Sequence, residues 1–113
     1  MTYRVIATAR ARRDVDECFN FIAARSRRGA ASWFNAYEQA QSSLEREPNH
    51  GMAPESEFFH EPIREHFFKT RHSRPYRMLF VVRGEVVYVI HVRGPGQDLM
   101  SLDEIQIPPA DAE

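Results

Sequence analysis

The sequence predicts an α+β domain in which an antiparallel β-sheet packs on an N-terminal two-helix hairpin, in the order β-α-α-β-β-β. Two observations carry this prediction. Apolar residues recur at helical spacing up to Pro48 and then alternate in strand-like runs. Helices also do not alternate with the last three strands, which argues against a parallel, doubly wound sheet.

The first strand is predicted from alternation over residues 3–8, and Thr8 is a suitable N-cap for the helix that follows. We expect that helix at about residues 9–25. Ser26-Arg27-Arg28-Gly29 is short, polar and ends in glycine, so it predicts a sharp turn into a second helix that runs to about Glu47 and stops at Pro48. Trp33 and Tyr37 on the apolar stripe of that helix are predicted to lie in the core.

Three strands are predicted after an irregular connection, at residues 63–69, 76–82 and 86–92. Arg83-Gly84-Glu85 is interpreted as a three-residue hairpin loop with a positive φ at the glycine. That loop would pair Val82 with Val86, Met78 with Ile90 and Arg77 with His91. Residues 1–113 are therefore expected to form one domain, with a tail extension from about residue 98 to residue 113 whose ends are frayed.

The composition is that of a soluble globular protein, and no apolar run is long enough for a signal peptide or a membrane span. Cys18 is the only cysteine, so an intrachain disulfide is impossible and a cytoplasmic location is expected. His60, His66 and His72 lack the spacing of a metal site, and we expect no metal and no cofactor.

The 15 Lys+Arg and 16 Asp+Glu residues give a net charge of -1, so any case for nucleic acid depends on local clustering. Positive residues do cluster between Arg64 and Arg77, where Glu65 is the only acid. This run is either a solvated loop or a surface that faces phosphate or a protein partner. Alternation also places Phe67 and Phe68 on opposite faces, so one of them should need cover from the tail or from a partner.

Several strings, in this order and spacing, resemble the RelE/ParE superfamily of toxins from type II toxin–antitoxin systems, over about residues 2–100. They are Tyr3-Arg4-Val5, Ala30-Ala31-Ser32-Trp33, Leu44 with Pro48, Ile63-Arg64-Glu65, Tyr76-Arg77-Met78-Leu79-Phe80, Val89-Ile90-His91-Val92-Arg93 and Gln97-Asp98-Leu99. The resemblance implies a growth-inhibiting toxin that a small cognate antitoxin neutralises. RelE-like members cut messenger RNA on the ribosome, whereas ParE-like members act against DNA gyrase.

The RelE-like alternative needs a proton acceptor, cations at the phosphorane and an acid for the leaving oxygen. The resemblance implies Arg77 as the catalytic strand arginine, with Arg64 as a companion cation, and His91 is the best remaining proton carrier. The same resemblance favours the ParE branch, because no tyrosine follows Tyr88 and no histidine follows His91, where RelE-like nucleases often carry such groups. A structural role is the other interpretation: the charged heads of Arg77 and Arg93 would reach solvent or pair with Glu65 or Asp98, and His91 would be a hydrogen-bonded structural residue.

Two further sets are expected to meet partners. The residues expected to bind the target or RNA are Lys69, Arg71, Arg74 and Arg93. The residues expected to bind the antitoxin are Phe58, Phe59, Phe67 and Phe68, and the acidic and aromatic stretch from Glu55 to Phe59 is expected to contribute to the same surface. No interaction with a membrane is expected.

Overall fold

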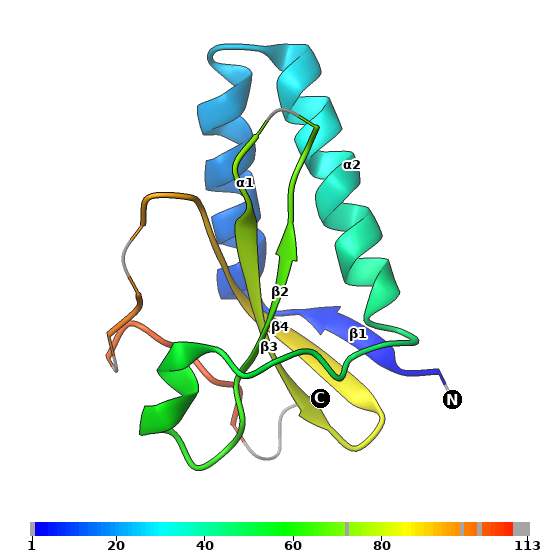
Figure 1. Ribbon diagram of the computed structural model, residues 1–113, viewed down its shortest axis with the longest axis vertical. Helices are drawn as coiled ribbons and strands as arrows, with labels where there is room; N and C mark the ends of the chain where they lie inside the picture. The colour runs from blue at the N-terminus through cyan, green and yellow to red at the C-terminus, as the bar shows by residue number, and fades with distance from the viewer. Residues whose placement is uncertain (1, 72, 98, 102, 110–113) are drawn as a thin grey trace.

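The computed structural model describes residues 2–71, 73–97, 99–101 and 103–109. Its elements, drawn in Figure 1, are β1 (Arg4–Ala7), α1 (Ala9–Ala23), α2 (Arg27–Ser43), the 3-10 helix η1 (Pro54–Phe58), β2 (Arg64–Phe68), β3 (Tyr76–Arg83) and β4 (Val86–Arg93). The predicted α+β fold and the order β-α-α-β-β-β are confirmed. Within these residues, no helix combines the length and the apolar character that crossing a membrane requires.

The sheet has the strand order β1-β4-β3-β2, and its three C-terminal strands pair antiparallel as predicted. β1 is the exception, because it lies at the edge of the sheet and runs parallel to β4, which makes the sheet mixed. Pairing between strands so distant in the chain leaves no local signal in the sequence, so the direction of β1 was not predictable from its alternation.

Both helices begin at hydroxyl caps. The Thr8 side chain accepts a hydrogen bond of 3.2 Å from the backbone nitrogen of Ala11, as predicted, and the Ser26 side chain accepts one of 2.9 Å from Gly29. Because Ser26 is itself the cap, the next three residues form the first turn of α2 and not the predicted connection. The predicted C-terminal ends are also too late: α1 ends at Ala23 and α2 at Ser43.

The helical hairpin covers one face of the sheet (Figure 1). Its buried apolar residues are Ala11 and Val15 from α1, Trp33, Tyr37 and Ala40 from α2, and Leu44 at the C-cap of α2, packed on Met78, Phe80, Val87 and Val89. The rings of Trp33 and Tyr37 stack with centroids 6.1 Å apart. The predicted core position of both aromatics is confirmed.

The second face of the sheet is also apolar, and irregular segments cover it. Leu79, Val81, Tyr88 and Ile90 are buried there under Ala53, Ile63, Met100 and Ile105. The described part of the tail extension therefore contributes core side chains, while residues 110–113, at its expected frayed end, lie outside the described residues. An apolar second face needs such cover, because leaving four large side chains in water would cost free energy of about 25 cal/mol per Å².

The β3–β4 hairpin turns over two residues and not three. Arg83 pairs with Val86, so Gly84 and Glu85 alone form the turn, and Val82 pairs with Val87 instead of Val86. Gly84 has the predicted positive φ, at 58°. A two-residue turn with a glycine at positive φ fits the twist of the paired strands.

A β-bulge then shifts the register a second time. Phe80 pairs with Val89 and Leu79 pairs with His91, so Ile90 is the extra residue on β4. As a result Met78 lies opposite Val92 and Arg77 opposite Arg93. The predicted pairs Met78–Ile90 and Arg77–His91 are wrong, and Arg77 and His91 are not cross-strand neighbours.

Candidate functional site

Arg77, the residue with the strongest claim to a catalytic role, is held in an ion-pair cluster in which Glu55 is buried and Arg77 and Glu65 are partly buried. From β3 its guanidinium binds Glu55 of η1 with two bonds, Nη1 to Oε1 at 2.9 Å and Nη2 to Oε2 at 2.7 Å. Nη1 also donates to Oε1 of Glu65 on β2 at 3.1 Å. The interpretation of Arg77 as a partner of Glu65 is thus confirmed, while Asp98, the other suggested partner of Arg77 or Arg93, lies outside the described residues.

Glu55 is the centre of this cluster. It is only 2% exposed, and its Oε2 also accepts a hydrogen bond of 3.0 Å from the backbone nitrogen of Met100 in the tail. Burial disfavours the carboxylate, but the bonds from Arg77 and Met100 outweigh it and lower the pKa of Glu55 from 4.5 to about 2. Both partners are therefore charged at neutral pH, and the guanidinium fork of Arg77 faces carboxylates instead of a phosphate.

His91 is completely buried and forms a second polar cluster. The backbone nitrogen of Gln106 donates to Nε2 of His91 at 2.9 Å, so a neutral ring carries its proton on Nδ1. Nδ1 lies 3.3 Å from Oδ2 of Asp14 in α1. The ring thus joins β4, α1 and the tail, and it has no surface from which to take a proton from a substrate.

Asp14 completes this second cluster from the buried face of α1. Its Oδ2 accepts from the backbone nitrogen of Val92 at 3.1 Å, and its Oδ1 accepts from Nε of Arg10 at 3.1 Å. Burial acts to raise the pKa of Asp14, but the adjacent His91 ring, the hydrogen bond from Val92 and the charge of Arg10 leave that pKa below its ordinary value. A carboxylate bound in this way positions α1 against the end of β4.

Arg64, the third proposed catalytic residue, lies on a different face of the sheet. It pairs with Phe80, which faces the helices, whereas Arg77 pairs with Phe67 on the other face. Nη1 of Arg64 donates to the backbone oxygen of His50 at 2.6 Å. The structure therefore does not bring Arg64, Arg77 and His91 together into one site.

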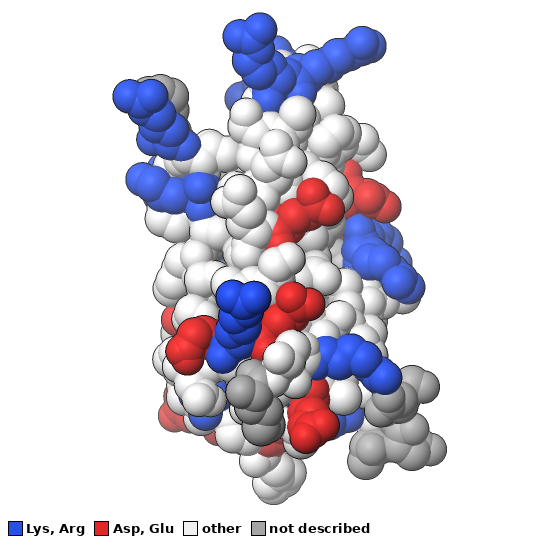
Figure 2. Space-filling model, turned by 90° about the vertical axis from the view of Figure 1, so that its right-hand side faces the viewer, with Lys and Arg blue, Asp and Glu red and all other residues white. Residues whose placement is uncertain are grey.

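Of the four residues expected to bind the target, three share one loop. Lys69, Arg71 and Arg74 are exposed between β2 and β3, and His72 of the same run lies outside the described residues. Arg93 is half-buried at the end of β4, opposite Arg77. In Figure 2 the charged side chains at one end of the visible face are Lys and Arg, whereas farther along it Lys and Arg are interspersed with Asp and Glu.

The four phenylalanines expected to bind the antitoxin do not form one surface. Phe58 and Phe67 are exposed, at 65% and 53%, whereas Phe59 packs against the second core cluster. Phe68 is buried against Trp33, Tyr37 and Tyr76. The alternation argument is confirmed for Phe67 and Phe68, and it removes Phe68 from the accessible surface.

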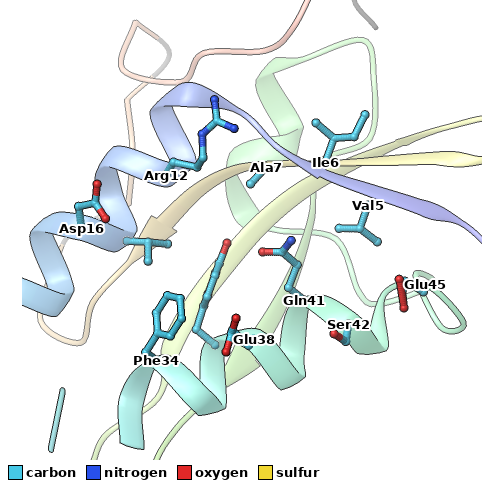
Figure 3. A pocket seen from close by; sticks show the side chains of 12 residues that line it. Val5, Ile6, Ala7, Arg12, Asp16, Phe34, Glu38, Gln41, Ser42 and Glu45 are labelled. Carbon is cyan, nitrogen blue, oxygen red and sulfur yellow. The ribbon is translucent and has the colours of Figure 1, made fainter. Parts of the chain in front are cut away.

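A groove that the sequence analysis did not predict lies between β1 and the helical hairpin (Figure 3). Its volume is about 640 Å³. The apolar part is formed by Val5, Ala7, Val15, Phe34 and Tyr37, and the charged side chains around it are Arg12, Asp16, Glu38 and Glu45. No short motif marks this groove, because it exists only where one flank of each helix meets the edge strand.

The open edge of β1 runs along this groove. Arg4 and Thr8 donate their backbone N–H groups to Glu85 and Val89 on the β4 side. Because backbone direction alternates along a strand, the N–H and C=O groups of Val5 and Ala7 point away from β4. An unpaired strand edge of this kind can accept an extended peptide segment.

Two buried carboxylates were missed by the sequence analysis. Asp14 follows Ala11 by three residues and precedes Cys18 by four, which places it on the apolar stripe of α1, and this spacing was a usable signal. Glu55 lies in an irregular segment beside exposed acids, so its sequence context gave no signal. The expectation that Glu55 belongs to a partner-binding surface is wrong, because its side chain is buried against Arg77.

Nucleophilic and metal chemistry have little support in these residues. Burial, followed by the charges of Asp14 and Glu17, raises the pKa of Cys18 to about 11, so its thiol is protonated at neutral pH. In the parts of the chain that the structure describes, no three or more His, Cys, Asp or Glu side chains are grouped to hold a metal ion.

The sequence was compared with those of known protein families. The sequence profile described as ParE toxin of type II toxin-antitoxin system, parDE, matches residues 5–99, which is most of the chain. A search of curated proteins found no match.

Glu55 makes the free energy of unfolding depend on pH in the acidic range. Its pKa is lower in the folded chain than its ordinary value, so its contribution is complete above about pH 4.5 and is lost as the pH falls toward about 2. A shift of this size corresponds to roughly 3 kcal/mol of unfolding free energy. In urea unfolding measured across this range, Glu55→Gln should be less stable than wild type at neutral pH and should lose less stability on acidification. Glu57→Gln, at an exposed neighbouring acid, should follow wild type; equal slopes for all three proteins would contradict the role of Glu55.

Proposed function

The chain belongs to the ParE toxin family of type II toxin–antitoxin systems, and we propose that it inhibits DNA gyrase by binding it, without cutting RNA. Family membership also implies a cognate antitoxin that holds the toxin inactive. The observation that carries the proposal is the ion-pair cluster of Arg77 with Glu55 and Glu65.

Cleavage of RNA would require groups that Arg64, Arg77 and His91 do not offer in this arrangement. A cation that stabilises a phosphorane must point its donors at the phosphate oxygens, but Arg77 directs both of its terminal nitrogens at carboxylates. A general base must reach the proton that it removes, but His91 is completely buried. An inhibitor that works by binding needs neither group.

We propose gyrase as the target because the chain matches the ParE family, and ParE-like toxins act against gyrase. This proposal also agrees with the sequence after β4, where Gly94-Pro95-Gly96-Gln97 replaces the histidine and tyrosine expected near the end of a RelE-like nuclease. Toxicity of this kind would depend on surface residues and on the docked tail, because these are the parts of the fold that a target enzyme can contact.

The proposed target is tested with the purified full-length toxin in two assays. Negative supercoiling of relaxed plasmid by gyrase should be inhibited, or cleaved DNA should accumulate, at a toxin concentration that leaves messenger RNA intact in a translating extract. Heat-denatured toxin is the control in both assays. Cleavage of messenger RNA at reproducible codon positions, without any effect on gyrase, would reverse the assignment to the RelE-like endoribonuclease.

For the antitoxin, we propose the groove of Figure 3 as the principal contact. The groove combines apolar side chains with the open edge of β1, so an extended or helical segment can bury apolar area and also form backbone hydrogen bonds there. Phe58 and Phe67 are the remaining exposed members of the aromatic set. Phe67 lies on β2, at the opposite edge of the sheet from β1.

This docking proposal is tested by reversing one charge beside the groove. Glu38→Arg, at an exposed position on α2, should weaken antitoxin binding by roughly tenfold, or about 1.4 kcal/mol, because a long cation enters the contact. Glu17→Arg is the matched control, since Glu17 is an exposed helical acid that does not line the groove. Affinities are compared by calorimetry after circular dichroism has verified the fold. Loss of binding in Phe67→Ser, with none in Glu38→Arg, would move the contact to the β2 edge.

A further inference from the structure

One end of the molecule is formed by two segments that contain cations and no acids. Residues 24–32 form the short connection after α1 and the first turns of α2, and the described residues between 69 and 75 lie in the loop that joins β2 to β3. Together they contain six Lys and Arg residues: Arg25, Arg27, Arg28, Lys69, Arg71 and Arg74. All six side chains are exposed, and we call this surface the basic end.

The charge of the basic end is not neutralised locally. The sequence has no Asp or Glu between Glu17 and Glu38, and none between Glu65 and Glu85. Among the described residues, ion pairs engage Arg10, Arg77 and Arg83, which lie elsewhere, and none engages the six cations of the basic end. A chain with a net charge of -1 therefore presents a concentrated positive field at this end.

A groove of about 590 Å³ is lined by residues of both segments. Arg28 from α2 and Arg71 from the β2–β3 loop both line it, together with side chains that carry hydroxyl or amide groups, namely Ser26, Ser32, Asn35, Gln39 and Thr70. These are the side-chain types that commonly bind phosphate oxygens and position a protein on a nucleic-acid backbone. Figure 2 shows the Lys and Arg side chains projecting from this end.

We propose that the basic end binds the phosphate backbone of double-stranded nucleic acid without regard to sequence. Neither segment contains Phe, Tyr or Trp, so the stacking platforms that single strands require are missing from these residues. Neither contains a large aliphatic side chain, so insertion into a lipid surface has no support. What these residues supply is charge and hydrogen-bond donors, which suits a duplex backbone.

This inference does not depend on gyrase being the target. Binding to a duplex would raise the local concentration of the toxin along DNA or along structured RNA, and the antitoxin groove lies on the other flank of α2. Glu38, Gln41 and Ser42 line the antitoxin groove, whereas Ser32 and Asn35 line the groove of the basic end. Both contacts are therefore geometrically compatible with one toxin molecule.

The test measures binding of the full-length chain to fluorescent duplexes by anisotropy at several salt concentrations. Comparing a DNA duplex with an RNA duplex of the same sequence shows which nucleic acid binds more tightly. Comparing it with a DNA duplex of scrambled sequence shows whether binding depends on sequence. Two double variants each remove two charges, Arg27→Gln/Arg28→Gln from one segment and Arg71→Gln/Arg74→Gln from the other. Arg13→Gln/Arg46→Gln removes two exposed charges elsewhere and is the matched control.

We expect each basic-end variant to weaken duplex binding by roughly tenfold at low salt and to reduce the salt slope by about 0.9 for every phosphate that the variant no longer neutralises. The control should retain wild-type affinity, and scrambling the sequence should change nothing. Binding that falls equally in the control would show a diffuse charge effect and overturn the proposal. So would the absence of duplex binding at low salt, or tighter binding to vesicles that contain phosphatidylserine than to any duplex.

Discussion

The buried pairing of Arg77 with Glu55 is the interaction on which the arrangement of this protein depends. It joins β3 to the irregular segment around η1, and through Met100 it also holds the tail. Two buried charges are stable together only when nearly all their hydrogen bonds are made. That condition is met here by the two-bond fork, by Glu65 and by the backbone of the tail. Removing either partner would leave the other charge without its ion-pair partner on the second face of the sheet.

The tail is fixed at three points, and this explains why a small chain has apolar residues on both faces of its sheet. Besides Met100, Gln106 binds His91, and the backbone oxygens of Pro108 and Pro109 accept from Arg83. Arg83 is itself paired with Glu61. Polar bonds at the ends of the tail hold Met100 and Ile105 against Leu79, Val81 and Ile90. Arg77 and His91, two of the three residues expected to be catalytic, thus serve to connect the sheet with the segments packed on it.

Local pattern predicted most of the fold, because helical spacing, alternation and caps are properties of neighbouring residues. Thr8, Trp33, Tyr37 and Gly84 each have the role that the sequence indicated. The β-bulge at Ile90 and the parallel pairing of β1 were not predictable, because both depend on contacts between distant segments. For the site, the sequence correctly marked Lys69, Arg71 and Arg74 as an exposed basic group. It could not show that Glu55 neutralises Arg77, or that β1 and the helices enclose a groove.

The central claim is that Arg77 supports the structure and does not act on a substrate, and a double-mutant cycle with Glu55 tests it most directly. Unfolding free energy and growth inhibition are measured for Arg77→Gln, Glu55→Gln and the double variant. Arg77→Gln alone should lose about 3 to 5 kcal/mol, because Glu55 remains charged and buried. The double variant should recover part of that stability and toxicity with it, since two neutral amides can still bind each other and Met100. A double variant that is as stable as Glu55→Gln but entirely non-toxic would contradict the claim and return Arg77 to a direct role.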